Sequence, residues 1–346
     1  MMRIFLLMFF LGLAPSTRGT ADDAEVRGGK ILFNEQGSLY VIDVDGANRR
    51  KLADNTRIAA LSPDGKLAAY ADKDSVRVVP VCGGESSFLA SISDGRVDAV
   101  EWSPDQKIVA YAVLVPNKSH DLFVVPYSVT GAGGAPRNMG HWYGGISFSP
   151  NGKFILEGAM NSANGGTQGS LETINVETGK REKLFVTSEM IAQAEYSPDG
   201  SYIAFMMTAL GQETGADDDE PDCAGPESDL WILAKGSAKP VKIIDNVFEF
   251  RLSPDGNFVA IGTGTQDCGY PPGDGAVFVS SIDAQVQFKL SREAPSMQPR
   301  FSPDGKSVIF VDFNASQLMI GDLATRTLSP MSGSSVQGYR KLYDWK

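Results

Sequence analysis

The sequence predicts an all-β fold, a β-propeller whose blades are four-stranded antiparallel sheets. A Ser-Pro-Asp-Gly motif or a near copy of it occurs six times, at spacings of 41 to 56 residues. A repeat period of this size is typical of solenoid and propeller architectures. The segments between the motifs are short and β-rich, at about four per repeat, which favours the propeller. The six copies begin at Ser62, Ser103, Ser149, Ser197, Ser253 and Ser302.

Residues 1–21 are predicted to be a secretory signal peptide, and residues 22–346 a single propeller domain. Arg3 is followed by the apolar run Ile4–Ala14, and small residues precede a cleavage site near Ala21. This order of charge, apolar run and small residues is typical of exported proteins. No later apolar run approaches the roughly 18 residues of a membrane helix. We therefore expect a periplasmic or secreted protein without membrane insertion.

Each motif is predicted to be the hairpin turn between the first and second strands of a blade. An alternating segment precedes it, as in 97–102, and a β-rich segment follows it, as in 107–111. Proline presets the backbone of the turn, aspartate bonds back to the turn backbone, and glycine accepts a positive φ. Gln106 stands where the other copies have glycine, and in a left-handed conformation it is expected to cost about 1 kcal/mol.

Two further strands complete each predicted blade. The third is apolar, as in 121–125 and 229–233, and the fourth is a weaker outer strand, as in 181–185. Residues 30–52 supply three strands without a first one. The strand candidate Tyr339–Tyr343 is predicted to fill that place, which closes the ring with seven blades and removes open edges. The alternative is six full blades plus an incomplete one.

The repeat unit resembles the WD-like repeat of the TolB family of propellers. The resemblance rests on the six motifs, on Asp-Leu-Trp-Ile-Leu at 229–233 and on Tyr-Val-Ile-Asp-Val-Asp-Gly at 40–46. It implies a periplasmic or secreted propeller of the TolB-like superfamily, whose members also serve as non-catalytic domains of prolyl-oligopeptidase-type enzymes. TolB itself has a separate α/β domain before a six-bladed propeller. We expect this chain to lack that domain, because the first predicted strand follows closely after the cleavage site.

The charge balance argues against nucleic acid and anionic lipid as partners. Without the predicted signal peptide the chain has 29 basic and 42 acidic side chains. Phosphate binding depends on clustered Lys and Arg, which an acidic chain of this kind does not favour.

Binding is expected on the face opposite the Ser-Pro-Asp-Gly turns, which we call the loop face. The loops between second and third strands lie there, and they are long at 161–170, 208–228 and 263–275. Long loops on a rigid scaffold often form binding sites.

Two cysteines lie in equivalent long loops of adjacent blades and are predicted to form a disulfide. Cys223 and Cys268 would be oxidised in an exported protein, and the bond would stabilise the fold by roughly 4 kcal/mol. Cys82 lies in a turn on the opposite face and is expected to be unpaired.

The longest loop is acidic and is a candidate ligand site. Its carboxylates, with Tyr270 of the neighbouring loop, are predicted to contact the ligand. Calcium is a weak candidate cofactor, held by carboxylate oxygens, but the spacing does not match an EF-hand. A solvated acidic loop is the alternative. The acidic candidates are Asp217, Asp218, Asp219 and Glu220, with Asp217, Asp219 and Asp222 for calcium.

The two histidines of the chain are further candidates. His120 and His141 are expected on the loop face, in neighbouring blades, with Trp142 and Tyr143 beside them. They would contribute to a ligand pocket or a metal site, although two histidines are too few for a structural zinc site.

Charged residues precede four of the turns on the inner strands. Glu101, Glu195, Arg251 and Arg300 are expected around the axial channel, with Lys341 in the corresponding place of the closing strand. They would form a ring of ion pairs or bind a small charged ligand.

Two functions remain open from the sequence. The first is a monomeric, non-enzymatic binding module without a cofactor, which presents the long loops of blades three to six to a protein or peptide, with a glycan as the alternative partner. The alternative is a metal-dependent hydrolase or lyase that acts on a glycan at the same face. The chain has no Gly-x-Ser-x-Gly nucleophile motif.

Overall fold

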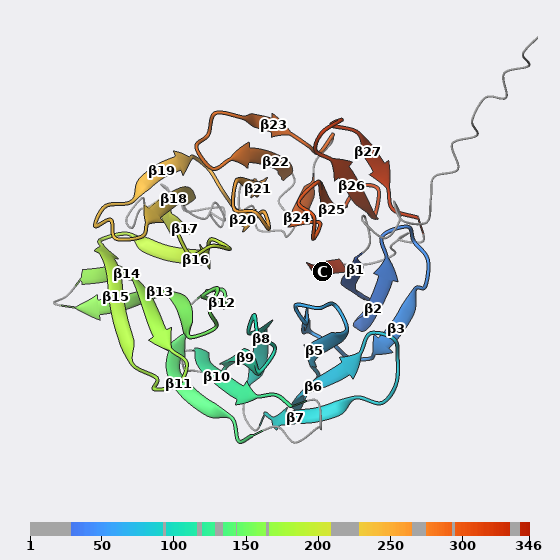
Figure 1. Ribbon diagram of the computed structural model, residues 1–346, viewed down its shortest axis with the longest axis horizontal. Helices are drawn as coiled ribbons and strands as arrows, with labels where there is room; N and C mark the ends of the chain where they lie inside the picture. The colour runs from blue at the N-terminus through green and yellow to red at the C-terminus, as the bar shows by residue number, and fades with distance from the viewer. Residues whose placement is uncertain are drawn as a thin grey trace, which may run out of the picture.

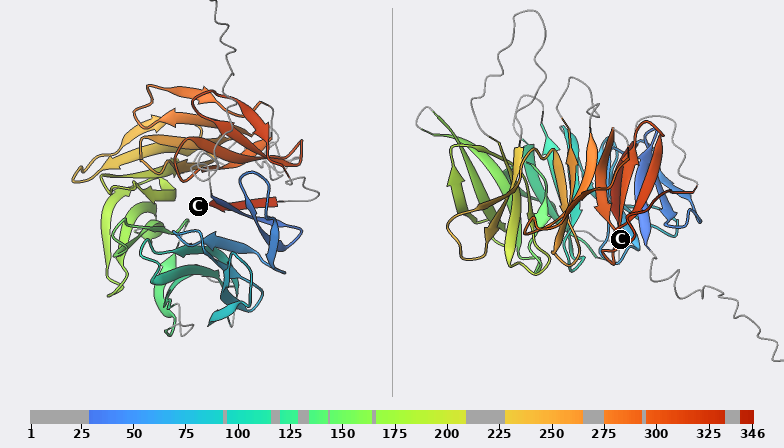
Figure 2. Two further views of the ribbon diagram at one scale, coloured as in Figure 1. Left: turned by 45° about the vertical axis from the view of Figure 1, so that its right-hand side comes forward. Right: turned by 90° about the horizontal axis from the view of Figure 1, so that it is seen from above.

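The protein is a seven-bladed β-propeller, as predicted. In the computed structural model, seven four-stranded antiparallel sheets surround a central axis (Figure 1). Seen edge-on they form a disc, with the C-terminus on one of its faces (Figure 2). The described part of the chain contains no helix that is long and apolar enough to span a membrane. The structure describes residues 29–92, 95–115, 120–128, 134–142, 144–163, 166–208, 228–264, 275–292, 295–332 and 340–346.

The strands of each blade follow one another outward from the axis. Blades one to four are β28 (Arg340–Trp345), β1 (Lys30–Glu35), β2 (Ser38–Asp43) and β3 (Arg50–Ala53); β4 (Ile58–Leu61), β5 (Leu67–Ala71), β6 (Ser75–Pro80) and β7 (Ser87–Ser91); β8 (Arg96–Trp102), β9 (Ile108–Leu114), β10 (His120–Pro126) and β11 (Arg137–Trp142); and β12 (Ser147–Phe148), β13 (Phe154–Ala163), β14 (Gly166–Asn175) and β15 (Arg181–Thr187).

Blades five to seven have the same order. They are β16 (Met190–Tyr196), β17 (Tyr202–Thr208), β18 (Ser228–Ala234) and β19 (Val241–Ile244); β20 (Glu249–Leu252), β21 (Phe258–Thr263), β22 (Ala276–Ser281) and β23 (Gln287–Lys289); and β24 (Ser296–Phe301), β25 (Ser307–Asp312), β26 (Gln317–Asp322) and β27 (Leu328–Pro330).

The C-terminal strand β28 is the innermost strand of blade one. It pairs antiparallel with β1, with Trp345 opposite Ile31 and Asp344 opposite Leu32. Trp345 is 4% exposed and packs among apolar side chains of blades one and seven. The last residues of the chain therefore bind its first described strand.

The hydrophobic core lies between the blades. The second strand of each blade is almost completely buried, as in β5 and β17, where the burial does not alternate along the strand. A sheet covered on both faces requires such continuous apolar runs. The fourth strands, such as β15 and β19, are largely exposed at the rim.

Blade four departs from the sequence prediction. Residues 161–170 were expected to form a long loop, but β13 and β14 are ten residues each and pair as far as Ala163 and Gly166. The second and third strands of this blade therefore continue as a long hairpin, with antiparallel pairing along the whole of β13 and β14.

The Ser-Pro-Asp-Gly motifs are hairpin turns, and their serine has a role that the sequence did not suggest. The Ser62 hydroxyl donates to Asp64 Oδ1 at 2.7 Å and accepts a bond from the Leu67 amide at 3.0 Å. The other five motifs repeat both bonds. Each serine thus ties its turn to the start of the second strand.

Gln106 has a φ of 59°, in the left-handed region, as expected from its place in the turn. Replacing it by glycine is expected to raise the free energy of unfolding by about 1 kcal/mol, because the Cβ strain disappears. The unfolding midpoint would rise by roughly 2 °C in a thermal scan. The reciprocal change Gly200→Gln, at a φ of 70°, is the control and should lower the midpoint. Equal midpoints for Gln106→Gly and the parent would contradict the strain argument.

Candidate functional site

The inner strands bring seven equivalent residues to the axial channel, and we call these the channel ring. Each lies directly before the last residue of the inner strand that pairs with the second strand of its blade. From blade one to blade seven they are Asp344, Ala60, Glu101, Ser147, Glu195, Arg251 and Arg300. The prediction of Lys341 for blade one was wrong, because the register with β1 places Asp344 there.

One ion pair of the ring joins blades five and six. Arg251 Nη1 lies 2.5 Å from Glu195 Oε1, and the Leu252 amide donates to Glu195 Oε2 at 3.2 Å. The Gln193 amide nitrogen donates to Glu195 Oε1 at 2.9 Å and to the Phe250 carbonyl at 2.6 Å. Glu195 therefore holds Arg251 in a fixed position at the wall of the channel.

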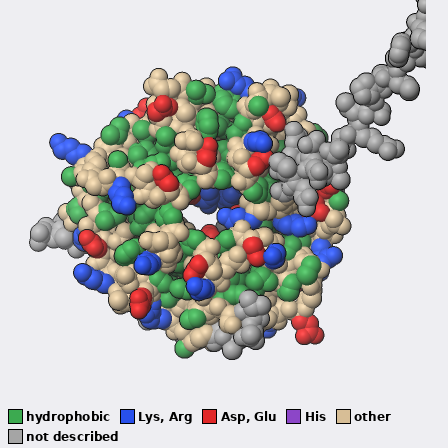
Figure 3. Space-filling view, viewed as in Figure 1, with side chains coloured by type: hydrophobic (Ala, Val, Ile, Leu, Met, Phe, Trp, Pro, Cys, Tyr) green, Lys and Arg blue, Asp and Glu red, His purple; other side chains and the backbone are tan. Residues whose placement is uncertain are grey.

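Two further cations, Arg300 and Lys346, lie near this pair, and Figure 3 shows Lys and Arg side chains around the central hollow. Burial, followed by repulsion from Arg251, lowers the pKa of Arg300 to about 10. Lys346 Nζ lies 3.8 Å from Asp344, whose carboxylate raises the lysine pKa. The side chains of Arg251 and Lys346 are partly exposed, so they retain contact with water.

Glu101 lies in the same channel and forms no ion pair with another described residue. Its carboxylate accepts a bond from the Trp102 amide at 3.1 Å. Burial raises the pKa of Glu101 to about 7. Lys346 lowers this pKa in part, whereas the Asp344 carboxylate raises it further. The ionised form of this carboxylate is therefore unfavourable in the folded protein.

We expect Glu101→Gln to change how stability depends on pH. Because the folded pKa lies above the ordinary value of 4.5, the folded state holds a proton that the unfolded state loses between pH 4.5 and 7. The parent should lose stability across that window, whereas the variant should not. At pH 8 the variant should be more stable by on the order of 2 kcal/mol. Denaturant titrations at pH 4.5 and 8 check this, and parallel pH profiles of the two proteins would contradict it.

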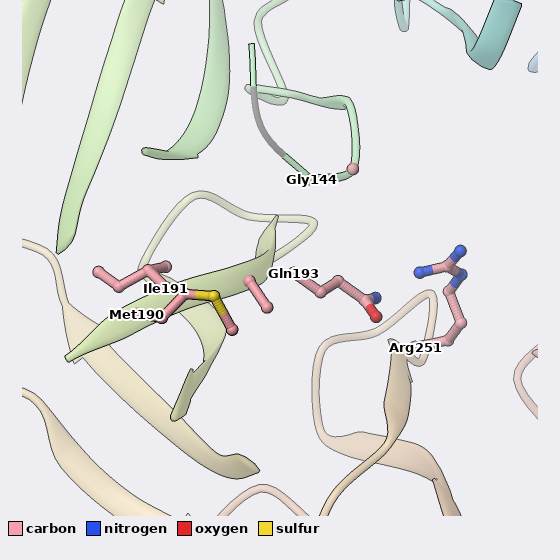
Figure 4. A pocket seen from close by; sticks show the side chains of 7 residues that line it. Gly144, Met190, Ile191, Gln193 and Arg251 are labelled. Atoms are coloured by element: carbon pink, nitrogen blue, oxygen red, sulfur yellow. The ribbon is translucent and has the colours of Figure 1, made fainter. Parts of the chain in front are cut away.

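A pocket of about 410 Å³ opens beside the ring at the start of β16. Gly144 and Gly145, from the connection between blades three and four, form one wall. Connections between blades lie on the loop face, so this wall of the pocket lies on that side of the disc. Figure 4 shows the ends of the Gln193 and Arg251 side chains pointing toward the same open space. The lining residues are Gly144, Gly145, Met190, Ile191, Ala192, Gln193 and Arg251.

The two glycines of the wall differ in what they tolerate. A Cβ on Gly144 would lie 2.6 Å from the Ala192 carbonyl oxygen, and its φ is 90°, so only glycine fits. A Cβ on Gly145 would meet no atom within 4 Å. A side chain can therefore be added at position 145, on the wall of the pocket, without a clash at its Cβ.

The two histidines lie in one blade, on opposite sides of its sheet. His120 and His141 lie in one blade, on the paired strands β10 and β11, and not in neighbouring blades as predicted. His120 pairs with Trp142 and His141 with Asp121, so the two rings point to opposite sides of the sheet. His120 Nε2 lies 3.2 Å from Asp98 Oδ2. His141 Nδ1 lies 3.4 Å from Asp121 Oδ1, and the side chain of His141 is 75% exposed.

The His120 ring also packs edge-on against Trp142, with 5.5 Å between ring centroids. Trp142 is 4% exposed and belongs to the core between blades three and four. His120 and Trp142, two of the predicted ligand residues, therefore pack against each other in this blade.

Several predicted site residues lie outside the described residues. Within the described ranges, no group of three or more His, Cys, Asp or Glu side chains is arranged to hold a metal ion. Cys82 is an exposed free cysteine, as expected. The predictions that lie outside the described residues concern Tyr143, Asp217, Asp218, Asp219, Glu220, Asp222, Tyr270 and the disulfide between Cys223 and Cys268.

No protein-family model and no curated protein sequence matches the chain. Solved structures share its fold. The tricorn protease superposes with a TM-score of 0.63 at 13% identity, over 90% of this chain and 34% of that one. An oligogalacturonate lyase in complex with manganese gives a TM-score of 0.60 at 11% identity, over 87% and 83%.

TolB from Acinetobacter baumannii superposes with a TM-score of 0.50 at 16% identity, over 95% of this chain and 88% of that one. The predicted propeller fold is thus confirmed, and TolB is one of the solved structures that share it. At such low identities the likeness concerns the fold alone.

Proposed function

We propose that this TolB-like propeller is an exported binding module that holds a protein or peptide partner on its loop face, centred on the pocket beside Arg251. The pocket is the observation that carries the proposal. Its volume of about 410 Å³ suits a few side chains of a partner, and its walls are apolar side chains and glycine backbone. Export after cleavage near Ala21 and a disulfide between the long loops are part of the proposal.

The lining favours binding over catalysis. A general acid and base must converge within hydrogen-bond reach of one reacting atom. The pocket contains one amide and one guanidinium, and both already bond to protein groups. A metal-dependent lyase or hydrolase acting on a glycan has less support, because His120 and His141 point to opposite sides of blade three.

Filling the pocket is expected to remove partner binding. Gly145→Phe places a ring in the pocket, where the backbone tolerates a Cβ, whereas Gly145→Ala leaves most of the pocket open. Tagged protein is incubated with the native envelope and secreted fractions, and captured proteins are identified by mass spectrometry. A specific partner should be captured by the parent and by Gly145→Ala, but not by Gly145→Phe.

Equal capture of that partner by both variants would place its binding elsewhere. The unfolding midpoints of the two variants are compared first, so that loss of binding is not a loss of folding.

A further inference from the structure

We propose that the pocket recognises a carboxylate, and that Arg251 is the cation that binds it. The occupant would be the free carboxyl terminus of an extended peptide whose last side chain is apolar. This inference rests on the proposed function and specifies the chemical group of the partner. It follows from three features of the pocket, namely the unused donors of Arg251, the fixed amide of Gln193 and the apolar wall.

The guanidinium of Arg251 retains donors for a ligand. A guanidinium carries five N–H donors, and those of Arg251 that bond to described residues are on Nη1. They contact Glu195 Oε1 at 2.5 Å and the Phe250 carbonyl at 3.1 Å. The Nε and Nη2 groups form the edge that binds a carboxylate through two parallel bonds. Because Glu195 already orients the group, little conformational entropy is lost when a ligand binds.

Gln193 positions the site and does not donate to the ligand. Its amide nitrogen has two N–H donors, and these go to Glu195 and to the Phe250 carbonyl. Its amide oxygen lies 3.5 Å from the Phe250 amide nitrogen. The residue links the inner strands of blades five and six, which fixes the distance between the apolar wall on β16 and the guanidinium on β20.

The charges near Arg251 are of both signs: burial disfavours its cationic form, but the Glu195 and Glu249 carboxylates raise its pKa. Arg300 is the next residue of the channel ring, and its pKa is lowered by Arg251, so the two guanidinium groups repel each other. The nearby Glu249 carboxylate accepts a bond from the Gln298 amide at 2.5 Å. A carboxylate placed at Arg251 would reduce the repulsion between the two arginines.

The rest of the pocket suits a short apolar side chain. Met190, Ile191 and Ala192 form one wall in sequence along β16, and the Gly144–Gly145 backbone forms the opposite one. A terminal carboxylate attached to an apolar residue would place its charge at Arg251 and its side chain against this wall. An acidic side chain within a peptide is the other source of the same group, and the test separates the two.

The test uses three labelled hexapeptide pools with random apolar sequences, measured by fluorescence anisotropy at pH 7.5. The first pool has free carboxyl termini, the second is amidated, and the third is amidated and contains one glutamate. We expect the free-acid pool to bind at least about tenfold more tightly than the amidated pool, as for a charge-assisted bidentate contact. Tighter binding of the glutamate pool than of the free-acid pool would overturn the terminal assignment.

Two variants identify the residue responsible. Arg251→Lys keeps the positive charge beside Glu195 but cannot form two parallel bonds to a carboxylate. It should therefore remove most of the difference in affinity between the free-acid and amidated pools. Gly145→Phe retains Arg251 and should abolish binding of every pool, while Gly145→Ala should not. Unfolding midpoints confirm that each variant is folded.

The outcomes separate this inference from the proposed function. The carboxylate assignment fails if the free-acid and amidated pools bind alike. It also fails if no pool binds while Gly145→Phe still prevents capture of the native partner. In both cases the proposed binding module stands. If Gly145→Phe affects neither the pools nor the native partner, both fail.

Discussion

Deletion of residues 340–346 is expected to lower the free energy of unfolding by at least about 5 kcal/mol. The deletion removes β28, exposes one edge of β1 and empties the site of Trp345, which is 4% exposed. Loss of a buried tryptophan alone costs about 3 to 5 kcal/mol. Ile31 and Phe33, both fully buried between blades one and seven, would then contact water.

Thermal and denaturant unfolding of the truncated protein measure this effect. A peptide with the sequence of residues 340–346, added in trans, should raise the midpoint again, whereas the same peptide with alanine for Trp345 should not. If these residues were a frayed tail, as the arrangement of six blades plus an incomplete one requires, the deletion would leave the midpoint unchanged.

The fold was predictable because its main signal is periodic. Proline, aspartate and glycine fix the same turn in each repeat through local backbone chemistry, which a sequence displays directly. Cross-strand register is different, because it depends on partners far away in the chain. The expected strand Tyr339–Tyr343 lies close to β28, but the register of β28 places Asp344 in the channel ring where Lys341 was predicted.

The prediction that the two histidines lie in neighbouring blades failed for a related reason. β11 is an outer strand with a weak pattern, since only two of its six residues are buried. Nothing local in such a strand shows that it folds back beside β10, with His141 opposite Asp121. The sequence therefore located His120 and His141 near one edge of the disc but assigned them to different blades.

The pocket was not predicted, apart from the presence of Arg251 near the channel. Its walls are formed by glycine backbone and by residues of β16, whose register shifts between Ile191 and Ala194. Gln193 lies two residues before Glu195 and shares its side of β16, so alternation along the strand places it toward the channel but does not show the pocket beside it. The signal that could have been used is the Gly144–Gly145 pair, which lies in a connection between blades.

Arg181→Ala is expected to destabilise the protein by about 3 to 5 kcal/mol, because it removes the cation that is paired with the buried Glu157 carboxylate. Arg181 on β15 forms an ion pair with Glu157, whose side chain is completely buried, and lies 3.8 Å from Glu172. Its other terminal nitrogen donates to the backbone carbonyls of Met139 and His141 in blade three. One side chain thus neutralises two facing carboxylates of blade four and links that blade to its neighbour.

Denaturant unfolding measures the loss, and Lys242→Ala is the matched control. Lys242 also contacts two carboxylates, Asp229 and Asp245, but at the exposed rim, where removing the cation should change the midpoint little. A comparable loss in both variants would show that burial of Glu157 is not the cause of the effect.

A second substitution separates charge from packing. In Arg181→Ala, Glu172 retains Lys183 at 3.7 Å, so Glu157 is the carboxylate that loses most. Adding Glu157→Gln replaces a buried charge by a neutral amide, which is less costly to bury. The double variant should therefore be more stable than Arg181→Ala, although less stable than the parent. If it is not more stable than Arg181→Ala, the arginine acts through its contacts with the backbone of blade three, and the link between blades is the larger contribution.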